Sequence, residues 1–185
     1  MMRSNSEGGN MHSEENECAE RNMDVIIDDV GSIPYIIIEF FALFSRLEFA
    51  LLSSGYSGGE VGTNAWVTWD RVATDLHKSF FADCIADQEV DILFREPARI
   101  LVKNEAGACK FVDGQIPQTS VQLLLQVRTI RNNLFHGSKV HFTDRDRLLV
   151  VAGIRVVRHL LDVLDKCEFT RKIRSAWAYA DIGFQ

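Results

Sequence analysis

Apolar residues are concentrated in a few long segments, and glycine-rich or polar stretches separate them. Residues 33–52 form the first apolar run, with Pro34 suited to a first helical position and Gly55 suited to end the helix. The pattern predicts a buried helix. Residues 55–62 are rich in Gly and Ser and predict a loop without the spacing of a phosphate-binding loop.

The middle of the chain predicts two more helices and then a change of pattern. Residues 64–82 and 87–95 have helical periodicity, and Pro97 ends the second of these runs. The periodicity is lost over residues 99–120, where short apolar stretches alternate with turn residues. We expect a loop or a small hairpin inserted there.

Two capping signals mark the helices of the C-terminal part. Thr119 with Gln122 opens the apolar run 121–136, and Gly137 suits the left-handed position after a helix. Thr143 with Asp146 opens a last long helix over residues 144–166. The whole pattern predicts an all-α bundle of about four to five helices.

Length and composition predict one domain with a tail. The chain has 185 residues, of which 46% are apolar, and this suffices for a single core. Residues 1–24 carry six acids and two bases and few apolar side chains, so we expect a disordered acidic tail followed by one helical domain over residues 25–185.

The sequence favours a cytoplasmic protein without a metal or another cofactor. Glu39, Arg46 and Glu48 interrupt the first apolar run before it reaches the ~18 residues that a membrane span needs. The four cysteines lie far apart and no Cys-x-x-Cys pair occurs, so reduced thiols are expected rather than a zinc site or disulfides.

Basic residues gather in the last third of the chain. The formal net charge is −6, yet residues 121–185 hold eleven bases and six acids. An excess of this kind on an otherwise acidic protein is typical of a local phosphate-binding surface, although a solvated basic face would look the same.

The run Arg131-Asn132-Asn133-Leu134-Phe135-His136-Gly137 lies in this basic part, at the end of a predicted helix. Arginine offers a permanently charged planar fork for phosphate oxygens. Histidine exchanges a proton near neutral pH. Arg131, Asn132 and His136 are therefore the candidate catalytic residues, and Arg128 and Lys139 are further candidates to contact the substrate.

The motif helix has two distinct faces. Leu123, Val127, Ile130 and Leu134 share a narrow sector that should face the core. The opposite sector combines polar and apolar side chains, namely Leu124, Leu125, Arg128, Arg131, Asn132, Phe135 and His136. A surface of this composition is too apolar to be simply solvated, which favours a protein contact beside a polar pocket.

The string from Val127 to Gly137 resembles the HEPN family of helical domains, whose hallmark is Arg, a polar residue, three to five further residues and His. Arg131, Asn132 and His136 match this hallmark, and Phe41 to Glu48 is similar to a first helix of the family. The resemblance covers about residues 33–166. Arg71 and His77 have a similar spacing, but Val72 removes the polar second position, so we interpret that pair as a chance match in the middle of a helix.

The resemblance implies a homodimer in which two helices over residues 121–137 meet and form one composite site that cleaves RNA without a metal. Arg131 would polarise the scissile phosphate, His136 would exchange a proton with the 2′-hydroxyl or the leaving oxygen, and Asn132 would hold the imidazole or the backbone. This scheme predicts a ribonuclease of antiviral defence or stress response, or a toxin.

Some family members are toxins whose regulatory antitoxin modifies a tyrosine two residues after the histidine. Ser138 stands at that position here, which argues against that form of regulation.

Structural roles compete with catalysis at each motif residue. Arg131 could form a salt bridge to an acid on a neighbouring helix, with Glu48 as a candidate, and His136 could cap the helix. The alternative function is a helical module without catalytic activity that binds a nucleotide or a protein partner through the same face.

Overall fold

The computed structural model describes residues 34–135 and 142–179. By internal contacts the chain divides into Met1–Tyr35 and Ile36–Gln185. Every described helix and strand belongs to the second unit, except the first residue of one helix. The predicted acidic tail, residues 1–24, lies outside the described residues.

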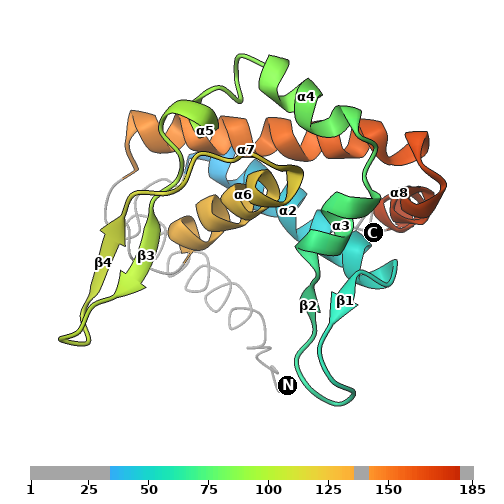
Figure 1. Ribbon diagram of the computed structural model, residues 1–185, viewed down its shortest axis with the longest axis horizontal. Helices are drawn as coiled ribbons and strands as arrows, with labels where there is room; N and C mark the ends of the chain where they lie inside the picture. The colour runs from blue at the N-terminus through green and yellow to red at the C-terminus, as the bar shows by residue number, and fades with distance from the viewer. Residues whose placement is uncertain (1–33, 136–141, 180–185) are drawn as a thin grey trace, which may run out of the picture. The chain divides into compact units, whose positions relative to one another are not determined.

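The described part is predominantly helical, with two short hairpins (Figure 1). Its elements are α2 (Tyr35–Ser53), β1 (Ser57–Gly58), β2 (Trp66–Val67), α3 (Trp69–Asp75), α4 (Ser79–Ala86), α5 (Ile92–Arg95), β3 (Ile100–Lys103), β4 (Cys109–Val112), α6 (Ser120–Phe135), α7 (Asp144–Val163), a 3-10 turn (Leu164–Lys166) and α8 (Glu168–Tyr179). The prediction of a predominantly helical fold is confirmed. The predicted count of four to five helices is too low, since these residues contain seven α-helices.

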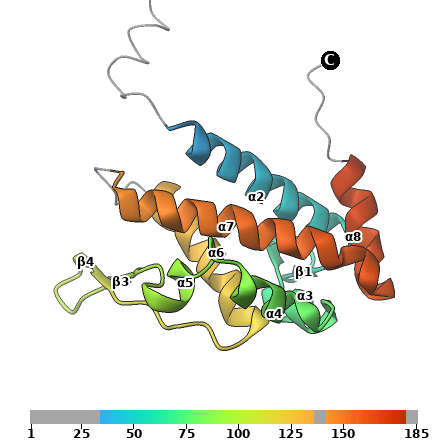
Figure 2. The ribbon, with the colours of Figure 1, turned by 90° about the horizontal axis from the view of Figure 1, so that it is seen from above.

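Helices α2 and α7 lie side by side and carry much of the core (Figure 2). At Gly153 of α7 a Cβ atom would come within 2.8 Å of the Phe40 ring on α2, so glycine permits the close approach. Phe40, Val156 and Leu160 are fully buried. The complete capping box that begins α7, Thr143 with Asp146, is confirmed.

The predicted helix over residues 64–82 is wrong as a single element. Trp66 and Val67 form a strand that pairs antiparallel with Gly58 and Ser57 of the predicted loop. Leu76 is extended and ends α3, and the Nδ1 atom of His77 accepts the backbone N–H of Ser79 at 3.3 Å. Such a local side-chain bond competes with helix continuation, so two short helices replace one long one.

The predicted helix over residues 87–95 shortens to the single turn of α5. Asp87 is extended, and its carboxylate accepts hydrogen bonds from Arg155 at 2.8 Å and from the backbone N–H of Glu89 at 2.9 Å. His159 also lies 2.8 Å from this carboxylate. Burial alone raises the pKa of Asp87, but the bonds from His159 and Arg155 outweigh it and lower the pKa.

The predicted insertion over residues 99–120 contains an antiparallel hairpin, in which Ile100 pairs with Val112 and Lys103 with Cys109. Gly107 in its turn has a φ of 81°, a backbone conformation that suits glycine. The sequence left a loop and a hairpin open, and the hairpin is observed. Among the described helices none is both long and apolar enough to cross a membrane.

Candidate functional site

The motif helix α6 begins one residue after Thr119, whose hydroxyl accepts the backbone N–H of Gln122 at 3.3 Å. The predicted capping box is only half formed, because the Gln122 side chain accepts the N–H of Gln118 instead of that of Thr119. Phe135 is the last described residue of α6. His136, Gly137 and Lys139 lie outside the described residues.

The core face of α6 matches the prediction. Leu123, Val127 and Ile130 are buried, and Leu134 is partly buried against the same core. Leu124 was expected on the opposite face but is 1% exposed. Because α6 packs against α3 and α4 as well as α7, its covered sector is wider than a single apolar stripe.

The side chain of Arg131 on α6 is half-buried and faces α2. Its NH1 atom donates to Oδ1 of Asn132 at 3.2 Å, and its guanidinium lies 6.0 Å from the centroid of the Phe44 ring. Its Nε atom is buried and has no hydrogen-bond partner among the described residues. A buried donor without a partner costs free energy, about 1–3 kcal/mol.

Glu48 of α2 faces this guanidinium. Its Oε2 atom lies 4.0 Å from the NH2 atom of Arg131, so the predicted ion pair to a neighbouring helix is observed at the long end of the range. Burial raises the pKa of Glu48, and the positive charges of Arg131 and Arg128 oppose this shift without cancelling it. The carboxylate therefore sits in a place that disfavours its charge.

Asn132 contacts Arg131 in the described residues, whereas the resemblance implied a contact to the imidazole or the backbone. The observed hydrogen bond fixes the orientation of the arginine fork. The next amide, Asn133, donates its Nδ2–H to the carbonyl of Arg99 at 2.8 Å and so attaches the end of α6 to the start of β3. Arg128 is exposed, as a substrate-binding role requires.

Apolar side chains are exposed on the two helices that carry this group of residues. Leu125 of α6 is 38% exposed, and on α2 the values are 52% for Ile38, 42% for Phe41 and 46% for Phe49. At about 100° per residue, Phe41 shares the side of α2 that carries Glu48. The semi-apolar character predicted for α6 therefore extends onto α2.

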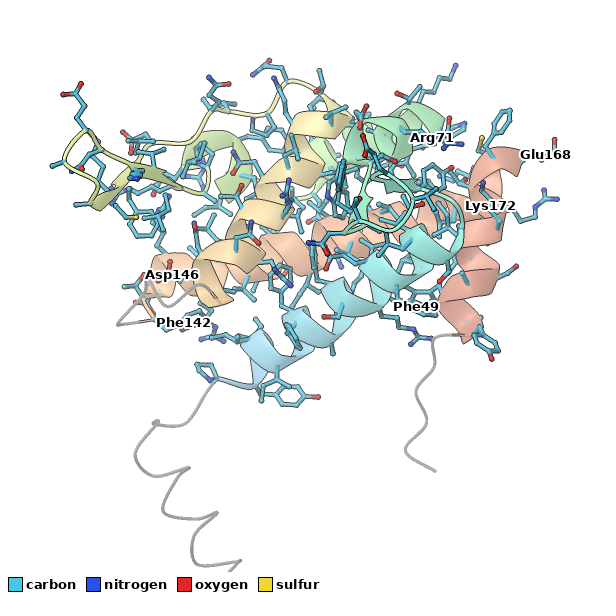
Figure 3. All side chains as sticks on the ribbon, turned by 90° about the horizontal axis from the view of Figure 1, so that it is seen from below. Phe49, Arg71, Phe142, Asp146, Glu168 and Lys172 are labelled. Atoms are coloured by element: carbon cyan, nitrogen blue, oxygen red, sulfur yellow. The ribbon has the colours of Figure 1, made fainter. Side chains whose placement is uncertain are left out.

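The second Arg/His pair lies elsewhere. Arg71 donates to the carbonyl of Gly55 at 3.2 Å and lies 5.4 Å from the centroid of the Tyr56 ring. Figure 3 shows Arg71 far from Asp146 at the start of α7, the end of the fold where α6 terminates. We expected this pair in the middle of a helix, but α3 ends at Asp75, before His77.

Gln126 is a structural residue that the sequence pattern does not reveal. It is 7% exposed, and its Oε1 atom accepts the N–H of Ala98 at 2.9 Å while its Nε2 atom donates to the carbonyl of Gln115 at 3.1 Å. One amide thus holds both ends of the hairpin insertion against α6. A glutamine within a helical run gives no signal of such a role, since most are exposed.

Comparisons with protein-family models, with curated proteins and with solved structures find no match. Among the described residues no group of three or more His, Cys, Asp or Glu side chains is placed to hold a metal ion.

Proposed function

We propose that this protein is a metal-independent endoribonuclease of the cytoplasm that cleaves RNA at a composite site in a homodimer. The observation that carries the proposal is the state of Arg131: Asn132 orients its fork, and its side chain stays 30% exposed. A phosphate oxygen would bind to this partly exposed guanidinium. The HEPN resemblance supports the reaction type.

In the proposed reaction the neutral imidazole of His136 removes the proton of a ribose 2′-hydroxyl, and the 2′-oxygen attacks the adjacent phosphorus. The bond from phosphorus to the 5′-oxygen breaks, and that oxygen takes a proton from an imidazolium. The products are a 2′,3′-cyclic phosphate and a 5′-hydroxyl. Arg131 stabilises the charge that develops on the phosphate oxygens.

The homodimer is supported by the exposed apolar side chains around the motif. Ile38 and Phe41 on α2 and Leu125 on α6 are exposed apolar side chains that a second copy would bury. Two copies meeting there would also bring two Arg131 side chains to one site. Defence, stress response and a toxin role remain the contexts that the resemblance favours.

The ion pair with Glu48 supports a second candidate. The Glu48 carboxylate beside the guanidinium offsets its positive charge and weakens its attraction for a phosphate. In that case the same face would serve a helical module without catalysis that binds a nucleotide or a protein partner.

Cleavage assays separate the two candidates. Purified protein is incubated with mixed RNA in EDTA, and the new ends are tested for 2′,3′-cyclic phosphate. We expect cleavage by the wild type and by Arg71→Ala, which removes a positive charge from the unrelated Arg/His pair, and no cleavage by Arg131→Ala or His136→Ala.

Light scattering on each variant verifies that the dimer is intact. Absence of cleavage by the dimeric wild type in large excess over RNA would contradict the ribonuclease and favour the binding module.

A further inference from the structure

A pocket of about 360 Å³ opens at the base of the β3–β4 hairpin, which is within the size range of small-ligand sites. Its walls come from residues 95–99, from residues 113–116 and from Arg145 in the first turn of α7. Three arginines and two acids line it, which leaves an excess of one positive charge.

The walls are fixed by contacts with the motif helix and with each other. Gln126 holds Ala98 on one side and Gln115 on the other. A Cβ atom at Gly114 would overlap the carbonyl oxygen of Ala98, so the two segments approach each other as closely as glycine allows. The pocket is therefore formed before any ligand arrives, which lowers the cost of binding.

Arg145 is held in place from α7. Its NH2 atom donates to the carbonyls of Glu96 at 3.0 Å and Pro97 at 2.9 Å, and its Nε atom lies 3.5 Å from the Glu96 carboxylate. Its positive charge thus has a fixed position on one wall.

Arg95 and Arg99 are less fully engaged. Arg95 meets Asp91 through Nε at 2.6 Å, and Arg99 meets Asp113 through Nε at 3.5 Å, which is longer than an ordinary hydrogen bond. Their terminal nitrogens have no hydrogen-bond partner among the described residues. The Arg99–Asp113 pair is 60% and 96% exposed, so it holds the arginine weakly and opens readily.

The base of the hairpin is attached to the motif helix. Asn133, two residues after Arg131, donates to the carbonyl of Arg99 at 2.8 Å. At about 100° per residue Asn133 lies about 200° around α6 from Arg131, so a strand that contacts both Arg131 and the pocket would have to cross the helix.

We propose that this pocket binds a backbone phosphate of the RNA beside the scissile one, with Arg99 and Arg95 donating their free terminal N–H groups and Arg145 supplying a fixed charge. The ligand class rests on the proposed function, since the excess positive charge of the lining by itself favours only an anion. The planar arginine fork suits phosphate oxygens. Asp113 competes with the phosphate for Arg99.

The test measures binding of a labelled 2′-O-methyl oligonucleotide. It lacks the 2′-hydroxyl that acts as the nucleophile, so it cannot be cleaved by the proposed route. Arg99→Ala should weaken binding about tenfold and reduce the slope of log Kd against log salt by about 0.7. Asp113→Asn should strengthen binding about two- to fivefold by freeing Arg99. Arg158→Ala is the matched control, because Arg158 is 52% exposed and paired with Glu39 at 3.0 Å on another surface.

The two variants move affinity in opposite directions, so general unfolding cannot imitate the result. Equal weakening by Arg99→Ala and Arg158→Ala, no gain from Asp113→Asn, or no binding by the wild type would overturn the phosphate site. Binding that follows the prediction while unmodified RNA stays uncleaved would refute the ribonuclease and leave this site standing.

Discussion

Replacing Gln126 by leucine tests how the hairpin insertion is held to the helices. The substitution keeps the approximate size of the side chain and removes its two hydrogen bonds, to the N–H of Ala98 and to the carbonyl of Gln115. Ala98 is 1% exposed, so its N–H would lose its partner without gaining water. Gln115 is exposed, and its carbonyl can bond to solvent.

The expected loss is therefore dominated by one buried donor, about 1–3 kcal/mol in the free energy of unfolding. For a chain of this size that corresponds to a fall in Tm of roughly 3 °C for each kcal/mol. Urea denaturation measures the stability, and hydrogen exchange at the Ala98 amide reports on the bond itself.

Gln122→Leu is the matched control. Gln122 lies one turn earlier on the exposed side of α6, where water can replace its bond to Gln118. Its loss should stay within about 0.5 kcal/mol. Equal stability of the two variants, or unchanged protection of the Ala98 amide in Gln126→Leu, would refute this account of the insertion.

Three further predictions concern titratable groups. The pKa of Asp87 is lowered in the folded state, so its contribution to stability is present above the unfolded pKa and is lost as pH falls through the folded value. Asp87→Asn should therefore destabilise the protein more at pH 7 than at pH 3 in urea titrations. An equal loss of stability at both pH values would refute this prediction. Burial first, and then nearby acids, raise the pKa of Cys84 to about 12. Peptide mapping after iodoacetamide treatment at pH 8 should therefore find the exposed Cys109 modified and Cys84 modified only on unfolding. Equal labelling of the two cysteines would contradict the burial of Cys84. Burial and the bond to Asp75 raise the pKa of Tyr56 to about 12, so Tyr56→Phe should cost about 1–2 kcal/mol in urea denaturation, and no loss would count against that bond.

Three of the long periodic segments form single helices as predicted. The first helix, the motif helix and the capped α7 follow from apolar spacing and caps within one segment. The capping box of Thr143 and Asp146 needs only a short piece of chain, and it forms in full.

Elements that depend on partners distant in the sequence were not predictable. Asp87 leaves the helical pattern where its carboxylate meets Arg155 and His159 of α7. Trp66 lies in a strand because it pairs with Gly58. Neither partner can be identified from the spacing around the residue.

The candidate site divides in the same way. The residue types and their spacing indicated Arg131 and Asn132 as candidate site residues. The sequence also indicated Glu48 as a candidate ion-pair partner of Arg131. The hydrogen bond between Arg131 and Asn132 and the link from Asn133 to the hairpin depend on side-chain orientation and tertiary packing. Periodicity contains no information on either.

The nucleophile is the central claim of the proposed function, and one substrate tests it directly. A short RNA with a mapped cleavage position is compared with the same RNA carrying a single 2′-deoxy nucleotide immediately 5′ of the scissile phosphate, both in EDTA with wild-type protein. The account predicts that the first is cut to a 2′,3′-cyclic phosphate end and that the second stays intact at that position while other positions are still cut. Cleavage of the 2′-deoxy bond at an unchanged rate would contradict the account, because attack would then come from water and not from the 2′-oxygen.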